Sequence, residues 1–343
     1  MPKLPQIIAR HSDNIDAVVS EFTGQLERVI KKAQATLLDE LAARLQLGPG
    51  NVVVATAGNR RILRGLDEMM ASALKRAGYQ DLLTGYVKSF DGQFTFFNDV
   101  LAAISDDLKF PLPAVTFDAH DGVEFEAIKI GTRDLLNDVL IKTADAAKRQ
   151  ALLSVGAINT KQLAAEIGHQ FGNTVSESEN LAMTSIASFY RTITDKGFRI
   201  IEEDLPGFKV RYRYEGPLDK LTRPFCIKLE KQSRGGKTWA RKEIDQLANG
   251  QIPNVFISGG GYRCRHQWLI DVNLIRQQQE TKGQPEPKGQ RPMTRERVQQ
   301  NIQARRVVIA ERLQNQVPRL TSQLVAAARL EALQAVQARR RAP

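Results

Sequence analysis

The chain has 343 residues, of which 42% are hydrophobic and 25% are charged, a balance typical of a globular protein with room for two domains. Its net charge of +11 favours anionic partners. Two cysteines exclude a disulfide scaffold, and because the sequence has neither an 18-residue apolar run nor the core of a secretion signal, we expect no membrane contact.

Residues 1–110 are predicted to be helical and to contain one long amphipathic helix. Over 13–47, apolar residues recur every three or four positions, which is the spacing of one helix face. Ser12 or Asp13 is placed to cap this helix, and Gly48-Pro49-Gly50 to stop it. Its apolar stripe must pack either within the chain or against a partner subunit.

Residues 111–197 are predicted to combine a hairpin with helices, after mainly helical spacing over 57–107. The hairpin is expected over 114–130, where apolar and polar residues partly alternate around His120-Asp121-Gly122. We interpret His120 as part of this turn and not as a catalytic group. The helices are expected over 131–153 and roughly 175–195.

Residues 198–275 are predicted to form a small module with antiparallel β-structure. Two extended runs over 198–214 are joined by Asp204-Leu205-Pro206-Gly207, a strong turn signal. Because strand side chains alternate, the second run has an apolar face and a cationic face. The apolar face holds Val210, Tyr212 and Tyr214, and the cationic face holds Lys209, Arg211 and Arg213. A strand, a glycine turn and a second strand are expected over 252–272.

The two cysteines of the chain and one histidine form the strongest candidate site. Cys264 and His266 are two residues apart on a predicted strand, so their side chains share a face. If Cys226 lies opposite, three ligands that zinc prefers converge. Asp219 is the nearest candidate for a fourth, and a water would serve for an open site. Structural zinc is one interpretation; packed reduced thiols and a Cys226–Cys264 disulfide are the others. A catalytic Cys–His pair is not expected, because side chains so close along one strand rarely present a base to a neighbouring thiol together with a third orienting group.

Three consecutive glycines, Gly259, Gly260 and Gly261, precede Cys264. Their amides could approach a phosphate, but the run is not G-x-G-x-x-G and no helix is expected after it. We therefore interpret the glycines as a sharp turn that permits close packing of the backbone.

Residues 276–343 are predicted to be a basic linker followed by an extended helical arm. Residues 271–343 hold 14 Lys or Arg and six Asp or Glu, so the tail carries most of the net positive charge. Such an arm either binds nucleic acid through phosphate contacts, without reading the sequence, or is simply solvated. The candidate nucleic-acid contacts are Arg305, Arg306, Arg339, Arg340 and Arg341.

A two-part pattern extends over 219–268. It opens with an Asp, a Thr three residues later and a Cys, continues through glycines and an aromatic residue, and closes with Cys-Arg-His. The matching residues are Asp219, Thr222, Cys226, Leu229, Gly235, Gly236, Trp239, Cys264, Arg265 and His266. This pattern resembles the head morphogenesis domain of tailed bacteriophages typified by phage Mu protein F. Structural roles in the motif are expected for Asp219, Thr222, Gly259, Gly260, Gly261 and Arg265.

The resemblance implies a minor head protein of a phage or prophage, which is added at the portal vertex during capsid assembly. Its expected partners are the portal protein, the scaffold or the major capsid protein, and double-stranded DNA bound non-specifically. Its expected location is the virion, in the head interior or at the portal vertex, with assembly in the host cytoplasm. We expect neither enzymatic activity nor a small-molecule substrate.

Two alternatives to this function are weighed. One is a zinc-stabilised nucleic-acid-binding protein. The other is the delivery module of a toxin-like effector enzyme, although the last 70 or so residues offer no His, no Cys and no clustered carboxylates for acid–base chemistry. In each case the predicted fold is α+β, with a predominantly helical N-terminal region, the β-containing module and the helical arm.

Overall fold

The structure, a computed structural model, describes residues 4–108, 111–204 and 210–271. All of these residues belong to the first of the two units into which the chain divides, residues 1–280. The described part of the first unit is mainly helical and contains a small two-stranded antiparallel sheet, which confirms the predicted α+β class. The predicted linker and arm lie outside the described residues.

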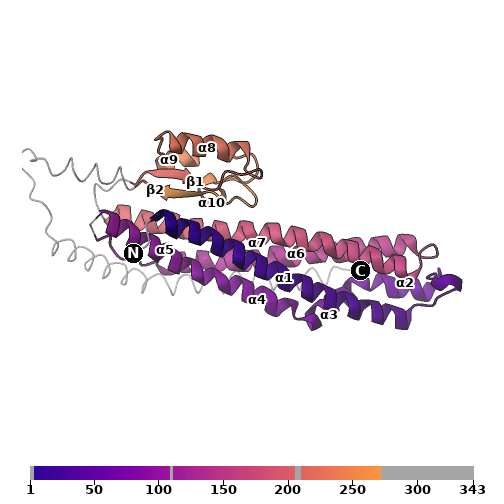
Figure 1. Cartoon of the computed structure of the whole chain (residues 1–343). Coiled ribbons are helices and arrows are strands. Elements are labelled where there is room, and N and C mark those ends of the chain that lie inside the picture. The colour runs from indigo at the N-terminus through magenta and orange to yellow at the C-terminus, as the bar shows by residue number, and fades with distance from the viewer. Residues whose placement is uncertain (1–3, 109–110, 205–209, 272–343) are drawn as a thin grey trace, which may run out of the picture. The chain divides into compact units, whose positions relative to one another are not determined.

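Four helical columns run up and down and make up most of the described chain (Figure 1). The first column is α1 (Leu4–Arg44), the third is α6 (Ala119–Ser154) and the fourth is α7 (Thr160–Asp204). The second consists of shorter helices that follow one another beside α1. This arrangement is that of an up-and-down four-helix bundle.

Short interruptions divide the second column. Gly78 ends one helix with φ +95°, a left-handed conformation that glycine adopts without steric cost. A 3-10 turn makes the next division. The elements between the first and third columns are η1 (Pro49–Asn51), α2 (Ala57–Arg64), α3 (Leu66–Ala77), α4 (Tyr79–Lys88), η2 (Ser89–Asp91) and α5 (Gly92–Leu108).

The apolar stripe of α1 is buried inside the bundle. Ala33 and Leu37 are fully buried, and α1 packs along α7 and the second column. Of the two alternatives for this stripe, packing within the chain is therefore confirmed. The predicted cap is wrong, because Ser12 and Asp13 lie well inside a helix that extends back to Leu4.

The hairpin predicted over 114–130 is wrong, because helix α6 begins within it. The Asp118 carboxylate caps this helix by accepting a hydrogen bond from the Asp121 backbone amide at 2.8 Å. The Asp121 carboxylate in turn accepts a hydrogen bond from the Asp118 backbone amide. These two aspartates form a capping box, in which Asp replaces the more usual Glu. His120 is exposed in the first turn of α6.

The strand predicted for the first part of 198–214 is also wrong, because α7 continues through it to Asp204. Phe198 and Ile201, three residues apart, are both buried on one face of the helix. The predicted boundary between residues 197 and 198 therefore falls inside a helix. The second run is confirmed in part, as β1 (Tyr212–Glu215), with its apolar face buried. Lys209 lies outside the described residues.

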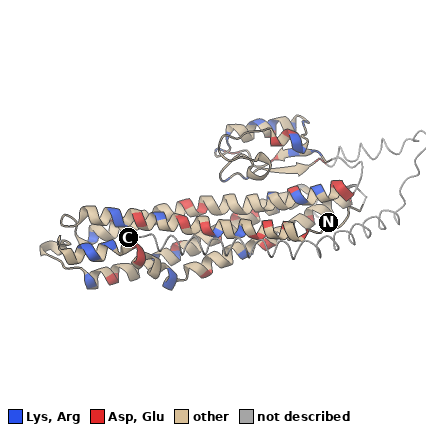
Figure 2. Ribbon diagram, turned by 180° about the vertical axis from the view of Figure 1, so that it is seen from behind, with Lys and Arg blue, Asp and Glu red and all other residues tan. Residues whose placement is uncertain are grey.

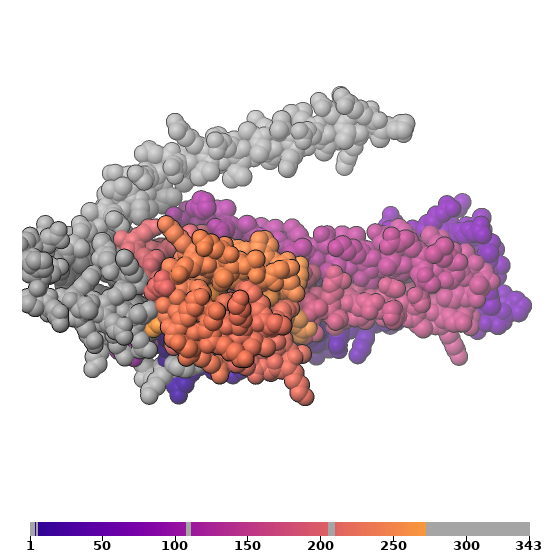
Figure 3. Space-filling view, turned by 90° about the horizontal axis from the view of Figure 1, so that it is seen from above, coloured from indigo at the N-terminus to yellow at the C-terminus, as the bar shows by residue number. Residues whose placement is uncertain are grey.

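Residues 210–271 form a small module that packs on α7 (Figures 1 and 3). Strand β1 pairs with β2 (Gln267–Ile270), and Tyr214 lies opposite Trp268. A strand predicted near 252–258 is instead the single helical turn α10 (Val255–Ser258), which Asn254 caps. The remaining helices of the module are α8 (Pro224–Arg234) and α9 (Arg241–Asp245).

Candidate metal centre

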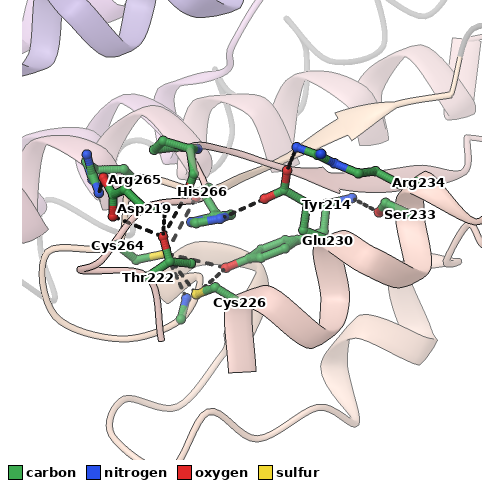
Figure 4. Close-up of polar contacts among 12 residues, drawn as sticks. Tyr214, Asp219, Thr222, Cys226, Glu230, Ser233, Arg234, Cys264, Arg265 and His266 are labelled. Atoms are coloured by element: carbon green, nitrogen blue, oxygen red, sulfur yellow. Dashed lines mark hydrogen bonds and ion pairs between the residues drawn. The ribbon is translucent and has the colours of Figure 1, made fainter. Parts of the chain in front are cut away.

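Three potential metal ligands converge at the centre of the module (Figure 4). Cys226 lies in the first turn of α8, which starts with proline, a favoured first helical residue. Cys264 and His266 lie in the loop just before β2, not on the strand itself. One donor atom of each lies within 4.8 Å of the others, and all three side chains are buried. Sequence reasoning thus identified a cluster whose members come from segments almost 40 residues apart.

The glycine run makes this convergence possible. A Cβ atom on Gly260 would lie 2.1 Å from Cys226 Sγ, so any other residue would displace the thiol. Gly259 and Gly261 have φ of +58° and +102°, which side-chain-bearing residues rarely adopt. The Gly260 amide donates a hydrogen bond to Cys264 Sγ at 3.0 Å. The interpretation as a close-packed turn is therefore confirmed.

The two cysteines share a hydrogen bond and are free thiols. Their Sγ atoms are 3.9 Å apart, well beyond the length of about 2.05 Å that a disulfide requires. The hydrogen bond from Cys226 lowers the pKa of Cys264 well below its usual value, with nearby Arg191 as a further cause. The same bond, together with burial, raises the pKa of Cys226. Cys264 is therefore the first of the two to become a thiolate.

Tyr214 lies beside both sulfurs, a contact that the sequence pattern did not predict. Its hydroxyl is 3.4 Å from Cys226 Sγ and 3.4 Å from Cys264 Sγ, and its ring stacks on His266. Burial raises the pKa of this hydroxyl well above its ordinary value. Its place on the apolar face of β1 was predicted, but the pairing with β2 that brings it to the cysteines was not.

His266 is held by a buried carboxylate, which sequence reasoning also missed. His266 Nε2 lies 3.0 Å from Glu230 Oε2, and both side chains are almost fully buried. Arg234 donates to the other oxygen of Glu230 at 2.6 Å. The available signal was the spacing, because Glu230 follows Cys226 by four residues and therefore lies on the same face of α8.

Arg191 anchors the cysteine loop to the bundle. This buried residue of α7 donates from Nη2 to the carbonyl oxygens of Cys264 and His266, both at 2.6 Å. Its Nη1 donates to the carbonyl of Ile257 at 3.0 Å. No sequence signal distinguished this arginine, because its partners are backbone groups more than 60 residues away.

Asp219 does not join the three ligands, so the prediction of it as a fourth is wrong. Its carboxylate forms an ion pair with Arg265 and accepts hydrogen bonds from the Leu221 amide and the Thr222 hydroxyl. Thr222 also donates to the carbonyl of Pro217 at 3.0 Å. These bonds fix the loop before α8 and tie it to the Cys-Arg-His segment, as expected for structural residues of the motif.

The five arginines predicted to contact nucleic acid lie outside the described residues. Within the part that is described, positive and negative side chains are interspersed along the bundle (Figure 2). The module is more basic, since residues 210–271 contain 12 Lys or Arg and six Asp or Glu. No described helix combines the length and apolarity that a membrane span requires.

Comparisons with protein-family models, with curated proteins and with solved structures found no match for this chain. The geometry itself therefore carries the interpretation of the site. It is a buried cluster of two thiols and one imidazole that could hold a metal ion.

Proposed function

We propose that this chain is a minor head protein of a phage or prophage that acts in capsid assembly at the portal vertex. The observation that supports the proposal is the way in which the two halves of the Mu F-like pattern interlock. Asp219 pairs with Arg265, and Cys226 lies against Cys264. Residues that are matched in the pattern but distant in sequence thus build one compact module.

The proposed protein works by binding and not by turnover. Its portal, scaffold or major capsid partner would meet the outer surfaces of the bundle and module. The excess of cations in the module and in the tail would favour non-specific contact with packaged double-stranded DNA. The proposed location is the head interior or portal vertex of the virion, after assembly in the host cytoplasm.

Mass spectrometry of purified procapsids and virions tests this function. We expect peptides of the chain at low copy in both, and co-purification with the portal ring. An Arg265→Ala variant, supplied in place of the wild type, should enter fewer heads, while Lys220→Ala, an exposed change in the loop that carries its partner Asp219, should enter normally. Particles that assemble fully and contain no copy of the chain would contradict the proposal.

We also propose that the metal is structural zinc. Two thiolates and one imidazole are ligands that tetrahedral zinc sites commonly use, and the burial of all three suits a closed site. Metal analysis of the purified full chain should find about one zinc per molecule, and the Cys226→Ser variant should lose it. A metal-free wild type that is fully folded would leave packed reduced thiols as the correct interpretation.

A further inference from the structure

The two sulfurs and the imidazole nitrogen leave one corner of a tetrahedral zinc site to be filled. The hydroxyl oxygen of Tyr214 lies beside both sulfurs. We propose that the Tyr214 hydroxyl is the fourth ligand and that Glu230 is the residue that positions His266. This inference rests on the zinc site proposed above and completes its coordination. It also makes the site closed, with no position left for a substrate or a reactive water.

Three distances between the donor atoms are close to those of a tetrahedron around zinc. Bonds of about 2.3 Å to sulfur and about 2.1 Å to oxygen give edges of about 3.8 Å between two sulfurs and about 3.6 Å between sulfur and oxygen. The cluster has 3.9 Å between Cys226 Sγ and Cys264 Sγ, and 3.4 Å from Tyr214 Oη to each sulfur. Three of the six edges are therefore already close to the lengths that a bound zinc ion would set.

The other nearby oxygens are committed elsewhere. Asp219 is bound to Arg265 at the exposed edge of the module, and both oxygens of Glu230 have partners. The hydroxyl of Tyr214, in contrast, is hydrogen-bonded to the two sulfurs and to no other group among the described residues, and its side chain is fully buried. Its position on β1 is fixed by a hydrogen bond that the Tyr214 backbone N–H donates to Ser233 Oγ at 2.7 Å.

Glu230 prepares His266 to bind a metal. With a hydrogen on Nε2 donated to Glu230, the neutral imidazole keeps its free lone pair on Nδ1. Carboxylates that fix a metal-binding histidine in this way are common, and they hold both the tautomer and the ring orientation. Arg234 in turn keeps the carboxylate in place. Gly216 leaves room for the ring, because a Cβ there would lie 2.6 Å from His266 Cγ.

The protons and charges of the completed site can be counted. Zinc uptake releases the two thiol protons, and the resulting thiolates neutralise the charge of the ion. The imidazole coordinates as a neutral group, whereas the Tyr214 hydroxyl would bind zinc as the phenolate and release a third proton. The site would then carry one net negative charge, which the nearby guanidinium of Arg191 offsets from its place on the carbonyl oxygens of Cys264 and His266. The Gly260 amide further stabilises the Cys264 thiolate.

The test measures zinc affinity of the full chain by competition with a chelator, and the visible spectrum after Co²⁺ replaces Zn²⁺. Tyr214→Phe should weaken zinc binding at least about tenfold and change the cobalt spectrum, because one ligand is lost. Tyr212→Phe is the matched control, since Tyr212 is buried on the same strand but lies outside the cluster. It should leave both measurements unchanged.

Glu230→Ala should weaken zinc binding about 10- to 100-fold while the cobalt spectrum keeps its four-ligand form. Glu230→Gln, which retains an acceptor for Nε2–H, should recover most of the affinity. If both variants lost the same amount of stability, and if Glu230→Gln bound zinc no more tightly than Glu230→Ala, the role of Glu230 would be purely structural. X-ray absorption of the zinc-loaded wild type adds a measurement that needs no variant, and should find two sulfur and two nitrogen or oxygen neighbours.

The outcomes separate the two levels of the proposal. A wild type that binds no zinc contradicts the zinc site itself, but leaves the role in head assembly to the mass spectrometry. Zinc binding with wild-type affinity and spectrum in Tyr214→Phe overturns the fourth ligand alone. X-ray absorption that finds only three neighbours around the zinc ion, or more than four, would also overturn the fourth ligand.

Discussion

The bundle and the module are built on different physical principles. In the bundle, long helices bury a continuous apolar stripe, so stability is spread over many similar contacts. In the module, short elements pack around a small aromatic core and are also joined by individual polar contacts of Arg191, Glu230, the two cysteines and His266. The charge differs as well, because residues 1–209 contain 23 Lys or Arg and 27 Asp or Glu, whereas the module has an excess of cations. The bundle therefore relies on repeated helix packing, whereas the module brings the candidate metal ligands together.

The largest expected effect is on the bundle core. Leu37 is fully buried in α1, and Leu37→Ala should lower the free energy of unfolding by about 2–5 kcal/mol through lost burial and the cavity left behind. Leu153→Ala, at a side chain 83% exposed, should change it by no more than about 0.5 kcal/mol. Denaturant titration followed by circular dichroism measures both. Equal effects of the two changes would argue against the bundle core as described.

The junction between bundle and module should respond to pH through His11. Burial lowers the pKa of His11 from 6.5 to about 4, and its ring is hydrogen-bonded to Gln93 of the bundle and lies against the tilted ring of Tyr190. The unfolded chain takes up this proton at higher pH than the folded chain does. Stability is therefore full above pH 6.5 and falls as the pH is lowered towards 4, by up to roughly 3 kcal/mol.

A variant isolates this contribution of His11. His11→Gln should flatten the loss of stability between pH 6.5 and 4, as measured by urea titration at each pH. His169→Gln removes an exposed histidine from α7 and should leave the slope unchanged. If His11→Gln retains the whole wild-type slope, other groups cause the acid sensitivity.

An intermediate effect is expected in the glycine turn of the module. Gly260→Ala places a methyl group against Cys226 Sγ, and the resulting displacement should cost about 1–3 kcal/mol and reduce the zinc content. Gly122→Ala is the control, because no atom lies within 4 Å of its added Cβ in α6. That change should be neutral or stabilising by up to about 1 kcal/mol. Thermal unfolding with metal analysis compares them.

The smallest expected effect is at the Asp219–Arg265 ion pair. This pair is partly exposed, so a double-mutant cycle with Asp219→Ala and Arg265→Ala should give a coupling energy of about 0.2–1 kcal/mol in stability. The main role of the pair would then be to hold the loop before α8 against the Cys-Arg-His segment. A coupling energy of several kcal/mol would place this contact among the main stabilising features of the module.

The sequence predicted best where one local period determines the structure. The stripe of α1 and the alternation at Tyr212 and Tyr214 were both found, because neighbouring residues suffice to define them. Asp118 and Asp121 misled the prediction, because a capping box and a hairpin turn use the same polar residues. The strand over 198–201 failed because burial against the bundle extends α7 beyond the expected end.

The candidate site was predictable only in part. Cys226, Cys264 and His266 could be chosen by their chemistry, and the structure brings all three together. Asp219 was predicted as the fourth ligand because it is close to Cys226 in sequence. Closeness in sequence does not determine the direction in which a carboxylate on an exposed loop points. Tyr214 reaches the sulfurs only through the pairing of β1 with β2, and such long-range pairing cannot be derived from local periodicity.

The central claim is that a metal-closed module sits on a bundle that does not need the metal. Hydrogen exchange of the full chain, with and without a zinc chelator, tests this claim most directly. Chelation should remove protection from the amides of β1, α8 and β2, while those of α1 and the middle of α6 keep theirs. Unchanged protection throughout the zinc-loaded chain after verified loss of the metal would contradict it.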